Sequence, residues 1–131
     1  MKQRTFRLKS GQFLKEEIEK RTKDISAGVL LSIVGAIENA NLRMAGATPA
    51  NQIVKNFEGP FEIVSGTGTI SQDGSHIHIS VSNNEGKVIG GHLKDGCKVA
   101  VTAEIVIGVF DNMSYKRIYD EDTGFKELET E

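Results

Sequence analysis

The sequence predicts an α+β fold: a compact, largely antiparallel β-sheet domain with one main helix. Several segments alternate apolar and polar residues with the period of two that is typical of half-buried strands. Turn sequences such as Gln72-Asp73-Gly74 and Lys94-Asp95-Gly96 separate these segments. Only the segment from Gly11 to about Thr22 has apolar residues at helical spacing. With 131 residues, the chain has the length of a single domain, residues 1–131.

The composition points to a soluble, cytoplasmic protein. The chain has 38% hydrophobic and 26% charged residues, as ordinary soluble domains do. No apolar run approaches the ~18 residues of a membrane span, and no signal peptide precedes the first charges. The single cysteine, Cys97, excludes an intramolecular disulfide, which fits a reducing compartment. We therefore expect a cytoplasmic localisation and no membrane partner.

The charges are distributed unevenly along the chain, although the net charge is only −2. Residues 1–23 contain eight basic and three acidic residues, whereas the part from Asp111 onward contains three basic and seven acidic ones. Residues from about 120 to 131 are expected to form an acidic C-terminal tail. The basic end could contact phosphates. Its Arg and Lys residues alternate with apolar ones, however, which favours the solvated face of a strand and a helix.

The N-terminal part is expected to contain a short strand and the main helix. Arg4 to Lys9 has the alternation of a strand. Ser10 is a suitable N-cap for a helix from Gly11 to about Thr22, in which the apolar side chains Leu14 and Ile18 are four residues apart. This amphipathic helix is expected to pack against the sheet.

The middle of the chain is predicted to be extended. Ile25 to Ala36 is almost uncharged and mixes β-branched residues with glycines, which favours a strand over a buried helix. Ile37 to Met44 follows as a second extended segment. Residues 50–58 show no clear pattern, Gly59-Pro60 predicts a turn, and Phe61 to Ile70 predicts a further strand.

The longest strand is predicted at Lys98 to Phe110. Its inward face is expected to carry six apolar side chains: Val99, Val101, Ala103, Ile105, Ile107 and Val109. Thr102 and Glu104 are expected on the opposite face. After a break, Tyr115 to Tyr119 is expected to add an edge strand.

All three histidines of the protein lie in one predicted hairpin, Ser75 to Leu93. Apolar residues alternate with His76 and His78, so the two imidazoles of this H-x-H sequence share one face of a strand, roughly 6.6 Å apart along it. Asn83-Asn84-Glu85-Gly86 predicts a turn, and the return strand contains His92.

The register of this hairpin decides whether His92 joins the other two histidines. A three-residue loop, Asn84-Glu85-Gly86, with Gly86 in the left-handed conformation, places His92 opposite His78 and on the same face. A two-residue loop places His92 opposite Ile77, on the other face. The first register pairs apolar residues with apolar residues, so it is the one we predict.

Three histidines on one face, His76, His78 and His92, predict a metal site. Imidazole is the commonest metal ligand in proteins, and three imidazoles with an open fourth position are typical of catalytic zinc. Zinc is the first choice, and nickel, iron or copper would suit the same ligands. Glu104 could be a fourth ligand, accept a hydrogen bond from a ligating imidazole, or act as a general acid or base. Its other interpretation is a cross-strand neighbour of a basic residue.

The segment HIHISVSNNEGKVIGGHLKDGCKVAVTAEIVIGVF resembles the core of the PPC domain, a family named for plants and prokaryotes. ISAGVLLSIVGAIENANLR is similar to the family's early strand pair, FEIVSGTGTI to its central strand, and Arg117 with DEDTGFKEL to its end. The resemblance implies a compact α+β domain that assembles as a homotrimer. The family's plant members are nuclear proteins that bind A/T-rich DNA through a separate AT-hook, a basic motif that this sequence lacks.

The same fold is similar to that of acetolactate decarboxylase, whose zinc is held by an H-x-H pair and a third histidine. The matching positions are His76, His78 and His92, so this resemblance implies the same three residues as metal ligands. The other catalytic residues of that enzyme have no equivalent here, so decarboxylation is not expected.

Two functions from different classes remain open. The first is a metal-binding, homotrimeric module with a DNA-binding or regulatory role, which recognises DNA, a small-molecule ligand or another protein. The second is a zinc-dependent enzyme that acts on a small oxo- or hydroxy-acid, with the three-histidine metal as Lewis acid. We favour the first because the family resemblance points to it and no second catalytic group is evident.

Overall fold

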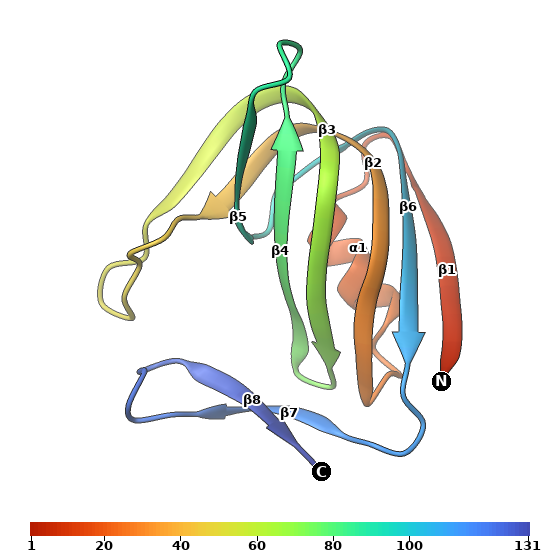
Figure 1. The fold of residues 1–131 in the computed structure, drawn as a ribbon, viewed down its shortest axis with the longest axis vertical. Coiled ribbons are helices and arrows are strands. Elements are labelled where there is room, and N and C mark those ends of the chain that lie inside the picture. The colour runs from red at the N-terminus through yellow and green to blue at the C-terminus, as the bar shows by residue number, and fades with distance from the viewer.

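The computed structural model describes all 131 residues and contains one helix and eight strands. The elements are β1 (Lys2–Lys9), α1 (Leu14–Arg21), β2 (Ala27–Arg43), β3 (Val54–Ser71), β4 (Gly74–Ser82), β5 (Val88–Leu93), β6 (Val99–Val109), β7 (Tyr115–Tyr119) and β8 (Lys126–Thr130). β1 to β6 form an antiparallel sheet in the order β1-β6-β2-β3-β4-β5, and β7 pairs with β8 in a separate hairpin (Figure 1). The predicted α+β class with one helix is confirmed. No helix of the structure has the length and apolar character needed to cross a membrane.

Two long strands bend the sheet and close it at one end. β2 and β3 have 17 and 18 residues and pair over much of their length, with an irregularity near Ile37. Such irregularities bend strands and increase their twist, and both strands curve over at this end (Figure 1). The end of β2 thereby also pairs with β5, where Arg43 lies opposite His92. β2, β3, β4 and β5 thus form a closed ring at this end.

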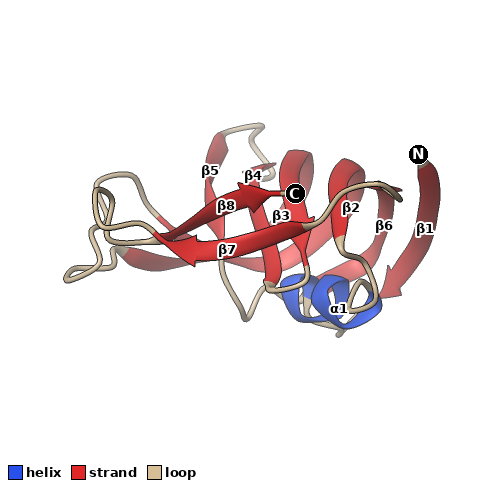
Figure 2. Cartoon of the chain, turned by 90° about the horizontal axis from the view of Figure 1, so that it is seen from below, coloured by secondary structure: helices blue, strands red, loops and turns tan.

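The helix covers only one face of the sheet (Figure 2). Leu14 and Ile18 of α1 are fully buried, as predicted. They belong to a cluster of 21 buried apolar residues, most of them on the inward side of the strands. Burial of this apolar surface is the main source of stability. The opposite, outward face of the sheet has no helix over it (Figure 2).

The helix begins later than predicted. Phe13, not Ser10, is the N-cap residue, and no side chain caps the helix. The residues before α1 instead bond to the chain that leads into β6, where Leu14 N donates to Cys97 O at 2.8 Å. This long-range hydrogen bond satisfies one of the backbone N–H groups of the first turn that have no partner within the helix. Tertiary pairing has therefore overridden the local capping signal.

Two predicted boundaries in the middle of the chain are wrong. Ile25 to Ala36 and Ile37 to Met44 were expected as separate segments, but most of both lies in the single strand β2. Gly59-Pro60, expected as a turn, lies inside β3. Proline is tolerated there because it falls at the irregular pairing with β2, where no regular ladder hydrogen bond needs its missing N–H.

One side chain of β6 departs from the predicted alternation. Val99 and Ala103 are buried as predicted, but Val101 is 75% exposed. The pairing of β6 with β2 shifts register after Gly35, and Val101 adopts a φ of 64°. The bulge turns Val101 outward and lets Ala103 return to the core side.

The C-terminal residues form a hairpin rather than a tail. Lys126–Thr130 is strand β8 and pairs with β7 at Tyr115–Tyr119. Its side chains are mostly exposed on both faces, so the segment lacks the apolar alternation by which a strand is recognised. The hairpin crosses the end of the sheet at which β3 turns into β4 (Figures 1 and 2). Arg117 N attaches it there by donating to Asp73 Oδ2 at 2.9 Å.

Candidate metal centre

The hairpin register predicted for β4 and β5 is confirmed. His78 lies opposite His92 in the ladder. The connecting loop contains Gly86 with a φ of 78°, in the left-handed region that favours glycine. His92 therefore shares the outward face of the hairpin with His76 and His78, while Ile77 between them is buried in the core.

The three imidazoles converge on one another. Nε2 of His76 lies 3.2 Å from Nε2 of His78, and the ring centroids are 5.0, 4.7 and 5.3 Å apart. One nitrogen from each of the three rings lies within 4.8 Å of the other two. Two nitrogens bound tetrahedrally to one zinc ion at ~2.0–2.1 Å lie roughly 3.3 Å apart. The donor set and the spacing of His76 and His78 therefore fit a shared metal ion.

Burial and nearby cations favour the neutral imidazoles. Burial, and then the charge of Arg43, lowers the pKa of His92 to about 3. Burial, followed by the charges of Arg117 and His78, lowers the pKa of His76. A neutral imidazole keeps the lone pair that a metal needs. His76 and His92 are therefore neutral at neutral pH, which is the charge state that ligation requires.

Arg43 sets the tautomer of His92. Arg43 Nη2 lies 3.1 Å from His92 Nδ1, and a guanidinium can only donate. His92 Nδ1 therefore accepts this hydrogen bond, and the proton of the neutral ring is on Nε2. A ring that ligates through Nε2 carries its proton on Nδ1, and a ring that ligates through Nδ1 has no lone pair left for Arg43. Coordination by His92 thus requires Arg43 to give up this contact.

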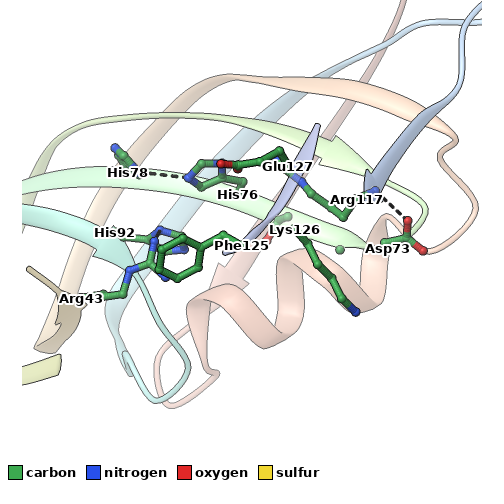
Figure 3. A pocket seen from close by; sticks show the side chains of 11 residues that line it. Arg43, Asp73, His76, His78, His92, Arg117, Phe125, Lys126 and Glu127 are labelled. Carbon is green, nitrogen blue, oxygen red and sulfur yellow. Dashed lines mark hydrogen bonds between the residues drawn. The ribbon is translucent and has the colours of Figure 1, made fainter. Parts of the chain in front are cut away.

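The histidines open into a polar cavity of about 410 Å³ (Figure 3). The end of β2 contributes Arg43, and the C-terminal hairpin contributes Arg117, Lys126, Glu127 and the one apolar residue, Phe125. The guanidinium carbon of Arg43 lies 5.0 Å from the centroid of the Phe125 ring, a cation–π distance. The remaining lining residues besides the histidines are Asp73, Gly74 and Ser75.

Sequence reasoning did not identify the cavity residues outside the hairpin of β4 and β5. Arg43, Phe125 and Glu127 are far from the histidines in sequence. They reach the cavity because the end of β2 closes onto β5 and because the C-terminal hairpin folds across the sheet. No local sequence pattern predicts either of these two long-range contacts. The signal of these three residues in the sequence, like that of Arg117, was only their place in the segments that carry the family resemblance.

Glu104 is not part of the centre, which corrects three of the roles considered for it. It lies on β6, opposite Arg7 on β1 and Val34 on β2. β6 is three strands away from β4 in the sheet, a separation of roughly 14 Å at ~4.8 Å per strand. Within the chain, Glu104 can neither ligate a metal at the histidines nor bond to a ligating imidazole. Its position fits the other interpretation, a cross-strand neighbour of a basic residue.

The fold and the site together define a class of protein: a small α+β domain with three convergent histidines on the outward face of its sheet. The chain belongs to the Plants and Prokaryotes Conserved (PCC, or PPC) domain family, whose model matches residues 1–111. This match confirms the resemblance seen in the sequence. The C-terminal hairpin lies beyond the matched residues.

Two solved structures share the fold over almost the whole chain. A hypothetical protein from Salmonella enterica is 28% identical with a TM-score of 0.91, and the match covers 99% of this chain and 93% of that one. A metal-containing protein from Archaeoglobus fulgidus is 27% identical with a TM-score of 0.85, and the match covers 98% of this chain and 94% of that one.

Curated relatives are much longer than this chain. The bifunctional protein GlmU of a Synechococcus strain is 38% identical over 129 residues, which is 95% of this chain and 20% of the relative. The AT-hook motif nuclear-localized protein 13 of Arabidopsis thaliana is 33% identical over 91 residues, 62% of this chain and 20% of the relative. The chain thus spans about a fifth of the length of the curated relatives it matches.

Proposed function

We propose that the protein is a metal-binding regulatory module, in which His76, His78 and His92 hold a divalent transition metal. The observation that carries this proposal is the convergence of three imidazole nitrogens to within 4.8 Å of one another. Zinc is the first choice because it accepts all-imidazole coordination and leaves a fourth position open. The fold shared with a metal-containing archaeal protein supports it. We also propose that the module works as a homotrimer in the cytoplasm.

Metal analysis tests this proposal directly. Protein purified without a histidine tag should contain about one divalent metal ion per chain by elemental mass spectrometry, and zinc should be the main element. His78→Ala should lower metal occupancy at least about tenfold, because two imidazoles remain. Ser80→Ala is the matched control on the same strand and should retain the metal. Equal metal content in the two variants would refute the site.

We propose DNA as the first macromolecular partner to test, because one relative is an AT-hook motif protein. The basic N-terminal region offers less free charge than its sequence suggests. Four of its basic residues lie within 4 Å of a carboxylate: Lys2, Arg4, Lys15 and Arg21. Gel shifts across a salt series are the test. Micromolar or tighter binding with a steep salt dependence would support DNA, and no shift at low salt would exclude it.

A metal-dependent enzyme acting on a small oxo- or hydroxy-acid is the second candidate function. It is favoured by Glu127, which lines the same cavity as the histidines (Figure 3) and could act as a general base. A metal at the histidines would supply Lewis-acid polarisation of a carbonyl. Proton–deuterium exchange at the carbon beside the carbonyl of pyruvate, followed by NMR, tests this. Exchange that is abolished by Glu127→Gln would support an enzyme, and no exchange with the metal-loaded protein would exclude this chemistry.

A further inference from the structure

We propose that the cavity beside the histidines binds a small organic acid, with Arg43 and Arg117 as the residues that hold its carboxylate. This inference rests in part on the proposed function, because the metal would occupy the floor of the same cavity. The chemical class of the ligand, however, follows from two arginines that are not metal ligands. Each arginine is partly buried and lines the cavity.

The first observation is that neither arginine has a carboxylate within the 4 Å of an ion pair, although the charge of Glu127 acts on Arg117 from a longer distance. All five ion pairs of the structure involve other cations: Lys2, Arg4, Lys15 (twice) and Arg21. Arg43 donates to a glutamine, Gln52 Oε1 at 3.3 Å, and to His92. Arg117 Nη2 donates to Thr69 Oγ1 at 2.8 Å, and burial lowers the pKa of its guanidinium. Partly buried cations usually have an anionic partner, so these two are available for an anionic ligand.

The second observation is that neutral groups hold both guanidinium groups in place at the cavity. Arg43 lies against the ring of Phe125, and Arg117 is fixed by Thr69. Arg43 lies beside His92 on one side, and Arg117 comes from the hairpin on the other (Figure 3). Positioned guanidinium groups match the planar, two-oxygen geometry of a carboxylate.

The charges around the cavity favour an anion. Its lining contains three cationic and two acidic side chains besides the histidines. Asp73 is already engaged by the backbone N–H of Arg117, and Lys126 points away from the histidines (Figure 3). Three neutral imidazoles leave the two positive charges of a metal ion uncompensated, which strengthens the preference. A cavity of about 410 Å³ is at the small end of ligand sites, so the ligand is a small acid.

The contact between Arg43 and His92 couples the two ligands. Arg43 must leave His92 Nδ1 when His92 coordinates a metal, and Nη2 of Arg43 then loses its protein acceptor, whereas Nη1 keeps Gln52. A carboxylate in the cavity can accept the hydrogen bond that Nη2 then offers. Metal loading should therefore raise the affinity for the acid, and the acid should raise the affinity for the metal by the same factor.

Isothermal titration calorimetry with succinate, pyruvate and inorganic phosphate tests the inference on metal-loaded and on chelator-treated full-length protein. We expect at least one of the two carboxylates to bind more tightly than phosphate, and more tightly to the metal-loaded form. Arg43→Gln and Arg117→Gln should each weaken carboxylate binding about tenfold or more, the effect of losing a charge-assisted hydrogen bond. Arg21→Gln, on α1 and away from the cavity, is the matched control and should leave binding unchanged.

The outcomes separate this inference from the proposed function. If the protein takes up no metal when metal is supplied, but binds a carboxylate through the two arginines, the acid site is supported and the metal module is not. A metal-loaded protein that binds neither carboxylate, or whose binding both variants leave unchanged, would overturn the acid site alone. Tighter binding of phosphate than of both carboxylates would overturn the ligand class. Unchanged thermal unfolding of Arg43→Gln and Arg117→Gln would show that their loss of binding is not due to misfolding.

Discussion

At the scale of single residues, His92 has competing partners: a proton, Arg43 and a metal. Its pKa of about 3, caused first by burial and then by Arg43, means that protons compete weakly with the other two. Arg43 is the stronger competitor because it occupies Nδ1 at 3.1 Å. The local environment therefore keeps the ring of His92 neutral and also fixes which of its nitrogens carries the proton.

This lowered pKa should make the stability of the chelator-treated protein depend on pH. In the unfolded chain an imidazole takes up a proton near pH 6.5, whereas folded His92 does so only at about 3. Between these values the unfolded state binds more protons, so the free energy of unfolding falls as the pH falls. The decline from His92 stays below the limit of about 1.4 kcal/mol per pH unit for one full proton, because solvent screens a half-buried group, and it ends below the folded pKa.

Urea unfolding of chelator-treated protein between about pH 7 and about pH 4 measures this dependence. The variant His92→Gln should show a flatter pH profile than the wild type, because one of the depressed imidazoles is removed. His76, whose pKa is also lowered, should account for part of the remaining slope. An identical profile for the variant and the wild type would contradict the assigned environment of His92.

At the scale of the elements, the site depends on the closure of β2 onto β5. Gly91 lies on β5 at this junction, and a Cβ built on it would be 2.9 Å from Arg43 O. Because the contact is with backbone, Gly91→Ala should push the two strands apart and separate Arg43 from His92. We expect a loss of about 1–3 kcal/mol in the free energy of unfolding and a change in metal affinity.

The control for this prediction is Val88→Ala on the same strand, where the side chain is 53% exposed. Exposed substitutions usually change stability by about 0.5 kcal/mol or less. Equal unfolding free energies for the two variants would show that the junction tolerates a side chain at Gly91. Chemical denaturation and metal titration of both variants provide the comparison.

The sequence predicted those elements whose determinants are local. The hairpin register followed from the alternation around His76 and from the requirement for Gly86 in the loop, and the structure agrees at both. The predicted features that failed are overridden by distant contacts. Ser10 is not a cap because the residues that follow it bond to the chain leading into β6, and Val101 turns outward in a bulge against β2. Arg43 and Arg117 were missed as site residues for the same reason.

At the scale of the whole molecule, the outward face of the sheet is the main feature that the single chain leaves unexplained. Exposed apolar side chains lie on this face of β2, β3 and β6: Leu31, Val34, Val64 and Val101, at 49%, 52%, 54% and 75% exposure. Val101 also keeps a left-handed backbone, which is rare for a β-branched residue. Such a face is typical of a protein–protein interface. The histidines lie on the same side of the sheet.

A homotrimer in which neighbouring subunits cover this face should be sensitive to charge placed on it. Leu31→Lys and Val64→Lys should each lower the mass in solution from that of a trimer toward that of a monomer, because an unpaired charge would be desolvated at the interface. Light scattering at micromolar concentration measures the mass, and Ser10→Lys, at an exposed position in the turn before α1, is the control. A monomer mass for the wild type would exclude the trimer. Monomeric variants that keep their metal would show that the three histidines of one chain suffice, as their convergence within one hairpin implies.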